Sequence, residues 1–203
     1  MRVRAKFTAL QTAYIAVCAA TLTAGKAALA AIPNVEVVSL LLGVYGYVFG
    51  LAGVLSSLVF CAVEVLIWGA GSWVVLYFIY WPLFTLLFAL LGKAKIKSRL
   101  IPLLCALTMT AFFGVLSSLI DTGLFTGFHE NFWRRFAVLY VRGGAFYLTQ
   151  IICNAVAFTL LFPPLCALLR RIAPAKLTRF KRKKPQAGAE KMRENTLNCH
   201  IIK

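Results

Sequence analysis

The chain has 203 residues, of which 61% are hydrophobic, and its mean hydropathy is +0.83. Soluble domains are only about 45–50% apolar, so the composition excludes an ordinary soluble protein and indicates that the bilayer is the solvent. The formal net charge of +16 does not indicate nucleic-acid binding, because the basic residues gather in short stretches beside apolar segments, as topology signals and anionic-lipid contacts do. We therefore expect an all-α polytopic membrane protein that binds no nucleic acid.

The hydropathy pattern predicts about six transmembrane helices, each close to the roughly 20 apolar residues that a span requires. In chain order they cover residues 7–31, 37–50, 52–67, 73–91, 100–120 and 144–169. Residues 37–66 are too long for one span, so we divide them at a weak break near Gly50; an unbroken helix there would give five spans and fit the charges less well. Residues 121–143 are expected to form a long connection. Kinks or helix ends are expected at the prolines in or near the spans, which lack a backbone donor: Pro82, Pro102, Pro163 and Pro164.

Basic residues form three clusters, at residues 2–6, 93–99 and 170–184. Six spans place these clusters on one side of the membrane together with both termini, while the other side holds most of the acidic residues. The positive-inside rule then predicts that both termini are cytoplasmic. We expect residues 1–175 to form one six-helix transmembrane, substrate-binding domain. Residues 176–203, which are polar and of mixed charge, are expected to form a basic, disordered cytoplasmic tail.

The first span has a competing interpretation. Its basic start, apolar core and the sequence Ala28-Leu29-Ala30 are also typical of a signal peptide with a small-residue cleavage site. The apolar segment is long for a signal peptide, and it continues through Lys26 into a polar joint. Both features favour an uncleaved transmembrane helix.

The joint Ile32-Pro33-Asn34-Val35-Glu36 connects the first two spans. A helix that served only as an anchor would not need Lys26, Asn34 and Glu36 at one membrane face, so the joint is interpreted as the rim of a ligand site. An ionisable group at the centre of a span costs about 2.5–3.5 kcal/mol, and Lys26 and Glu64 are the two best cases in this chain. They are predicted to pair with each other or to contact a ligand; alternatively, Lys26 snorkels to the outer headgroups.

Aromatic residues surround the loop between the third and fourth spans. Trp68 and Trp73 stand at its two ends. Trp73, Tyr77 and either Tyr80 or Trp81 share one helix face at i, i+4 and i+7 or i+8. They are interpreted either as an interfacial aromatic belt or as a stacking wall for a planar ligand.

A polar stripe runs along the last span. Tyr147, Gln150 and Asn154 lie at i, i+3 and i+7 on an otherwise apolar helix. This pattern is typical of interhelical hydrogen bonding, and a ligand pocket facing the outer half of the bundle fits it equally well.

The motifs typical of soluble enzymes and of metal sites are absent from the sequence. There is no CxxC pair, no GxxxxGK[ST], no HExxH and no GxSxG, so the sequence predicts no catalytic centre, no metal site and no cofactor. Energy for any transport must therefore come from an ion gradient or from another subunit.

Small residues recur every four positions on the first span, at Ala16, Ala20, Ala24 and Ala28. Faces of small residues let another helix approach closely in lipid. The partner is either a helix of the same bundle or a separate membrane subunit.

The sequence of residues 25–41, with the joint at its centre, resembles the substrate-binding S components of energy-coupling-factor (ECF) vitamin transporters. Shorter segments that also look like that family are Val48-Phe49-Gly50, the block from Glu64 to Trp73, and the block from Gln150 to Val156. The similarity covers about residues 8–170. Lys26 stands where an Arg is common in such relatives, which keeps the charge but not bidentate recognition.

The resemblance implies a six-helix subunit in the cell membrane of a prokaryote. Such a subunit binds a vitamin or related micronutrient from outside and delivers it through a transmembrane coupling subunit and two ATPases. The family's docking motif would map to Ala16 and Ala20, extended by Ala24, and the pocket would lie on the outer side. The residues predicted to bind the substrate are Lys26, Asn34, Glu36, Glu64, Trp68, Trp73, Tyr77, Tyr147, Gln150 and Asn154. The alternatives are a self-sufficient small transporter or channel, a membrane enzyme, and a membrane scaffold.

Overall fold

The computed structural model describes residues 8–32, 35–96 and 98–174, and its regular structure is entirely helical. Asn34 and the predicted tail at residues 176–203 lie outside the described residues. Five of the helices, α1 and α3 to α6, are long and apolar enough to cross a membrane. The chain is therefore an all-α polytopic membrane protein, as predicted. The helices are α1 (Ala9–Leu29), α2 (Val38–Phe49), α3 (Leu51–Trp68), α4 (Ser72–Lys93), α5 (Leu100–Thr126), α6 (Phe132–Leu160) and α7 (Phe162–Ile172).

Helix α2 is the buried centre of the bundle. Eleven of its twelve residues are buried, and it packs against α1, α3, α4, α6 and α7. Twelve residues rise only about 18 Å, so α2 alone cannot span a hydrocarbon core of about 30 Å. Two glycines let α2 and α4 approach backbone to backbone: a Cβ atom added at Gly92 would lie 2.2 Å from the carbonyl oxygen of Tyr47, and one at Gly46 would lie 2.4 Å from that of Thr85.

The break predicted near Gly50 is present. Gly50 has a φ of 63°, a backbone conformation that residues with a Cβ atom rarely adopt, and it ends α2 and begins α3. The predicted last span is also divided, because α6 ends at Leu160 and α7 begins at Phe162, directly before Pro163 and Pro164. Prolines are favoured in the first turn of a helix, and Pro102 likewise lies in the first turn of α5. Pro82, by contrast, lies inside α4 and does not end that helix.

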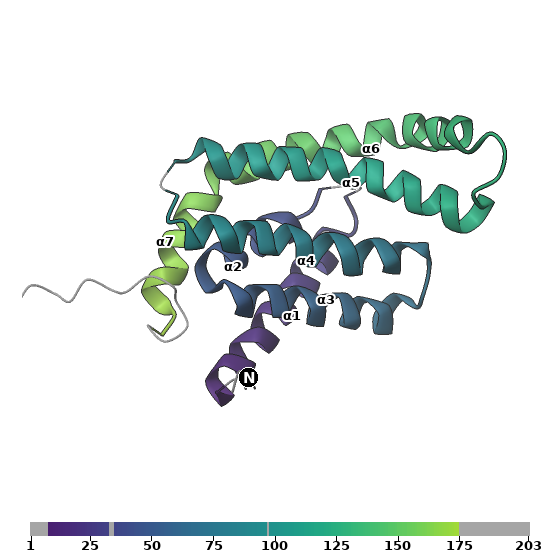
Figure 1. Cartoon of the computed structure of the whole chain (residues 1–203). Helices are drawn as coiled ribbons and strands as arrows, with labels where there is room; N and C mark the ends of the chain where they lie inside the picture. Colours follow the sequence, from purple (N-terminus) through teal and green to yellow (C-terminus); the bar gives the residue numbers. More distant parts are fainter. Residues whose placement is uncertain (1–7, 33–34, 97, 175–203) are drawn as a thin grey trace, which may run out of the picture.

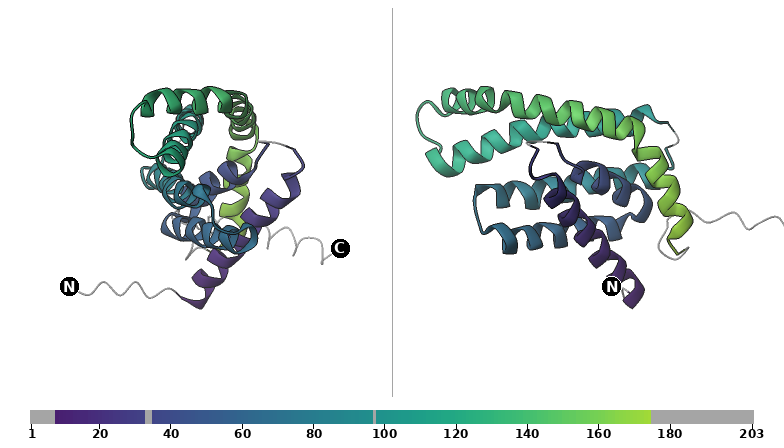
Figure 2. Two further views of the ribbon diagram at one scale, coloured as in Figure 1. Left: turned by 90° about the vertical axis from the view of Figure 1, so that its right-hand side faces the viewer. Right: turned by 180° about the vertical axis from the view of Figure 1, so that it is seen from behind.

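The prediction of a long connection over residues 121–143 is wrong. Helix α5 continues to Thr126 and α6 already starts at Phe132, so only a short turn separates them. That turn uses two residues with positive φ, Gly127 at 68° and Asn131 at 64°. Two of the views show the α5–α6 hairpin extending past the neighbouring ends of α3 and α4 (Figures 1 and 2).

Helices α3, α4, α5 and α6 run side by side, α1 crosses them obliquely, and α7 lies across their ends (Figure 1). We call one end of the bundle the basic end; it holds the start of α1, the Gly50 turn, residues 94–96, residues 98–99 and α7 (Figure 1). The opposite end, with the turns at 69–71 and 127–131, is the hairpin end. Five described cations gather at the basic end, in agreement with the predicted clustering: Lys93, Lys95, Arg99, Arg170 and Arg171.

Candidate binding site

The centre of the candidate site is an ion pair between α1 and α3. Lys26 lies in the last turn of α1, where a cation is favoured by the helix dipole, and its Nζ donates a hydrogen bond to Oε2 of Glu64. The side chain of Glu64 is 1% exposed and that of Lys26 is 30% exposed. Lys26 therefore turns toward the bundle and not toward the headgroups, and one of the predicted alternatives, the pairing of these two residues, is confirmed.

Tyr77 of α4 adds an aromatic face to this pair. The Nζ of Lys26 lies 5.1 Å from the centroid of the Tyr77 ring, within the range of a cation–π interaction. Tyr77 meets Trp73 edge to face at 5.0 Å and Trp81 at 5.7 Å. Trp73, Tyr77 and Trp81 therefore form a continuous ladder of rings, which we call the aromatic wall. Tyr80 meets the Trp81 end of this wall at 4.8 Å and extends the ring contacts to Phe113 of α5 at 4.9 Å.

Glu36 links the joint to α6. Its Oε1 accepts hydrogen bonds from Ser39 Oγ at 2.9 Å and from Gln150 Nε2 at 2.7 Å. Burial raises the pKa of Glu36, while the hydrogen bonds from Gln150 and Ser39 and the positive charge of Lys26 act in the opposite direction. The joint carboxylate thus lies in the same electrostatic neighbourhood as the ion pair.

The polar stripe of α6 faces α5 and the joint. Asn154 Nδ2 donates to Thr110 Oγ1 at 2.9 Å, and the Tyr147 hydroxyl lies 3.1 Å from Ser118 Oγ. These two contacts are the interhelical hydrogen bonds that the stripe predicts. Gln150 instead contacts Glu36 of the joint. In the stripe, Tyr147 and Asn154 therefore join α6 to α5, while Gln150 belongs to the candidate site.

The buried polar atoms in this region that have no hydrogen-bond partner among the described residues include Glu64 Oε1, Asn154 Oδ1 and Trp81 Nε1. Buried polar groups are paired in the great majority of cases, with protein or with water. These atoms therefore provide two acceptors and one donor for a bound molecule or for ordered water.

Two predicted residues stand apart from this cluster. Trp68, the last residue of α3, is 62% exposed and makes no ring contact within the described part of the chain. Asn34 lies outside the described residues. Sequence reasoning missed Ser39, Thr110 and Ser118 and named Trp81 only as an alternative to Tyr80. The one available signal was spacing, since Ser39 follows Glu36 by three residues and Trp81 follows Tyr77 by four.

The described residues hold no group of three or more His, Cys, Asp or Glu side chains that could bind a metal ion. Two cysteines contact backbone carbonyls of site residues through Sγ: Cys61, which is buried, contacts Tyr77 at 3.4 Å, and Cys153 contacts Glu36 at 3.7 Å. Charged groups, an aromatic wall and unpaired polar atoms are features that can bind a small molecule.

The predicted docking residues lie on the outside of the bundle. Ala16, Ala20 and Ala24 are all exposed, and only three residues of α1 are fully buried, Cys18, Ala19 and Leu22. The alanine face is therefore not used for packing within this bundle.

Comparisons with protein-family models, with curated proteins and with solved structures found no match to this chain. Function is therefore argued from the geometry of the site.

Proposed function

We propose that this chain is the membrane-embedded substrate-capture (S) subunit of an ECF-type importer in the cell membrane of a prokaryote. It binds a vitamin or related micronutrient at its outer side and delivers it through a coupling subunit and two ATPases. One observation supports the proposal: charged, aromatic and unpaired polar groups from α1, the joint, α3, α4 and α6 converge inside a membrane domain.

The charges of the site favour a particular class of ligand. The charge of Glu64 offsets that of Lys26, and the unpaired Oε1 of Glu64 is a hydrogen-bond acceptor. The aromatic wall offers ring faces to a flat molecule. The expected ligand is therefore a planar, nitrogen-rich micronutrient that donates hydrogen bonds and is neutral or positively charged, because Lys26 is already paired with Glu64 and an anion would be repelled by that carboxylate.

The outer face of α1 supports a partner-dependent mechanism. The chain has no P-loop, so ATP-driven transport requires other subunits. The exposed alanines Ala16, Ala20 and Ala24 form a face of small side chains on α1. A helix of a second membrane protein can pack closely against such a face.

The test begins with mass spectrometry of the small molecules released when the purified, detergent-solubilised protein is denatured. The compound found is then used in equilibrium binding to the wild type, to Glu64→Gln and to Tyr77→Leu, with Trp68→Leu as the matched control outside the aromatic wall. We expect each site variant to lose at least tenfold in affinity and the control to retain it. Equal affinity in all four proteins would refute this site.

Uptake into liposomes separates capture from transport. Proteoliposomes holding the chain alone should bind the compound without accumulating it, and accumulation should require the coupling subunit, the ATPases and ATP. Failure of the complete set to accumulate any bound compound would refute the importer proposal.

A second function is favoured by one specific observation: α2 rises only about 18 Å from the Gly50 turn at the basic end, so its first residue lies within the depth of the membrane. Broken helices near the middle of the membrane are typical of self-sufficient secondary transporters. Accumulation by the chain alone, driven by an ion gradient, would select this second function.

A further inference from the structure

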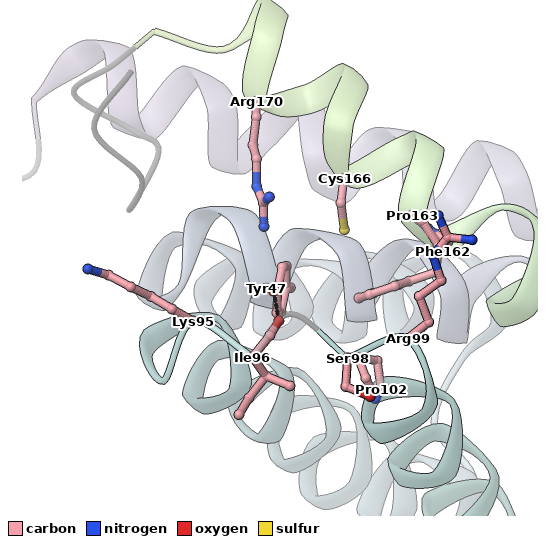
Figure 3. Close-up of a pocket in the computed structure, with 10 residues that line it drawn as sticks. All are labelled: Tyr47, Lys95, Ile96, Ser98, Arg99, Pro102, Phe162, Pro163, Cys166 and Arg170. Atoms are coloured by element: carbon pink, nitrogen blue, oxygen red, sulfur yellow. Dashed lines mark hydrogen bonds between the residues drawn. The ribbon is translucent and has the colours of Figure 1, made fainter. Parts of the chain in front are cut away.

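A cavity lies at the basic end of the bundle, remote from the candidate site. It has a volume of about 420 Å³, within the range of about 300–1,000 Å³ typical of ligand pockets. The end of α2, the loop between α4 and α5, the start of α5, and α7 enclose it (Figure 3). Its lining comprises Tyr47, Lys95, Ile96, Ser98, Arg99, Pro102, Phe162, Pro163, Cys166 and Arg170.

Three cationic side chains surround this cavity, and none of the described residues that line it is acidic. Arg170 extends from α7 toward Tyr47, with its guanidinium carbon 5.1 Å from the ring centroid; Arg99 reaches up beside Pro163, and Lys95 projects outward at the rim (Figure 3). Of the described carboxylates, Glu130 belongs to the turn at the hairpin end, and Asp121 accepts a hydrogen bond from Ser72 there at 2.7 Å. The cavity is therefore electropositive.

The rim of the cavity is held by backbone and side-chain hydrogen bonds. The Tyr47 hydroxyl donates to the carbonyl of Ile96, and the amide of Lys95 donates to Gly92 at 3.2 Å. The cavity also adjoins the start of α5 at Leu100, where the dipole of the helix favours an anion. A preformed rim lowers the ordering cost of binding an anionic group.

The cavity combines apolar walls with a charged rim. Phe162, Pro102, Pro163 and Cys166 line it, and α7 lies across the ends of the spanning helices (Figure 1). This combination suits an amphipathic molecule whose anionic group sits among cations and whose body contacts apolar surface. The leaflet next to the basic side of a membrane protein is rich in anionic lipid, and basic pockets between helices on that side bind lipid headgroups.

We propose that this cavity binds the phosphate of an anionic phospholipid from the leaflet at the basic end. Arg99 and Arg170 contact the phosphate, Lys95 supports it from the rim, and the glycerol region lies against Phe162 and Pro163. The site is independent of substrate capture and stands whether or not the chain belongs to an importer.

The test is native mass spectrometry of the delipidated, full-length protein titrated with phosphatidylglycerol or with phosphatidylcholine. The pocket variant is Arg99→Gln/Arg170→Gln. The matched control, Arg134→Gln/Arg142→Gln, removes the same charge from exposed positions of α6 at the other end. We expect the wild type and the control to bind phosphatidylglycerol at least tenfold more tightly than phosphatidylcholine. The pocket variant should lose at least tenfold in phosphatidylglycerol affinity.

Two further measurements keep the result interpretable. Arg99→Lys/Arg170→Lys retains both charges and should recover part of the affinity, which a variant that merely misfolds would not do. Competition with glycerol 3-phosphate distinguishes the source of the phosphate: no displacement supports a lipid, while displacement at equal concentration would overturn the lipid assignment in favour of a soluble phosphate ester. Equal phosphatidylglycerol binding by the pocket variant and the control would overturn the site altogether.

Discussion

Replacing Lys26 and replacing Glu64 should lower the free energy of unfolding by unequal amounts, although both substitutions remove the same ion pair. In Lys26→Met the Glu64 carboxylate, 1% exposed, stays buried without the ammonium group that it faces. Removing one partner of a buried pair costs about 3–5 kcal/mol, and the partial exposure of Lys26 places this case at the lower end, at about 3 kcal/mol. In Glu64→Gln the amide oxygen still accepts a hydrogen bond and Lys26 keeps its exposed part and its contact with Tyr77, so about 1 kcal/mol is expected.

The assay is the free energy of unfolding of the ligand-free protein in mixed micelles of a mild detergent and SDS, followed by circular dichroism. The double variant Lys26→Met/Glu64→Gln leaves no buried charge, so it should be only about 1 kcal/mol less stable than the wild type. The resulting double-mutant cycle has a coupling of about 3 kcal/mol. Equal losses in the two single variants, or additive losses in the double variant, would refute the argument that Glu64 is buried and depends on Lys26.

Three other expectations concern packing, docking and pH. Gly92→Ala places a Cβ atom 2.2 Å from the carbonyl oxygen of Tyr47, so α2 and α4 must separate and unfolding should become easier by about 1–3 kcal/mol. Gly144→Ala, which meets open space, is the control in the same unfolding assay. Ala20→Phe enlarges the exposed face of α1, and it should lower partner-dependent uptake at least tenfold while ligand affinity is unchanged; normal uptake would exclude this face as the docking surface. Burial raises the pKa of Glu36 above its ordinary 4.5, so the folded protein holds the proton more tightly than the unfolded chain, and this contribution to stability is lost as the pH rises above 4.5. Thermal unfolding as a function of pH should show that decline in the wild type and not in Glu36→Gln.

The spanning helices could be predicted because hydropathy and chain length restrict them strongly. A segment of thirty apolar residues exceeds one span, so a break between α2 and α3 had to exist, and Gly50 with its positive φ is where it occurs. The sequence could not show that α2 is shielded on nearly all sides by other helices, because an apolar helix has the same composition whether lipid or protein surrounds it.

The error at residues 121–143 has a physical reason. The first turns of α6 carry Arg134, Arg135 and Arg142, and these charges lower the hydropathy below that of a span. Helix formation does not require membrane depth, however, because aromatic residues at helical spacing pack along the projecting hairpin. Phe136 and Tyr140, for example, stack at 5.9 Å. Hydropathy predicts burial in lipid, not helicity.

The candidate site was predictable in its residue types but not in its pairings. Intramembrane charges are costly, so Lys26 and Glu64 were identifiable from composition alone. The hydrogen bond from Gln150 to Glu36 joins residues 114 positions apart, and only the packing of α6 against the joint determines it. Trp68 and Trp73 have similar positions beside one loop, yet only Trp73 joins the aromatic wall, because the rotation of each helix decides which side a residue faces.

Helix α1 carries both the alanine face and Lys26, and this shared position has a consequence under the proposed function. A partner that binds at Ala16 and Ala20 contacts the same rigid element whose last turn positions the ammonium group against Glu64. If the bound and free partner states differ in the position of α1, partner binding must change ligand affinity, and by linkage the ligand must change partner affinity by the same factor. We expect coupling subunit binding to weaken ligand affinity, because delivery requires release. Titrations of the ligand with and without partner, and of the partner with and without ligand, should give the same factor, and a factor of one in both would show that α1 does not connect the two sites.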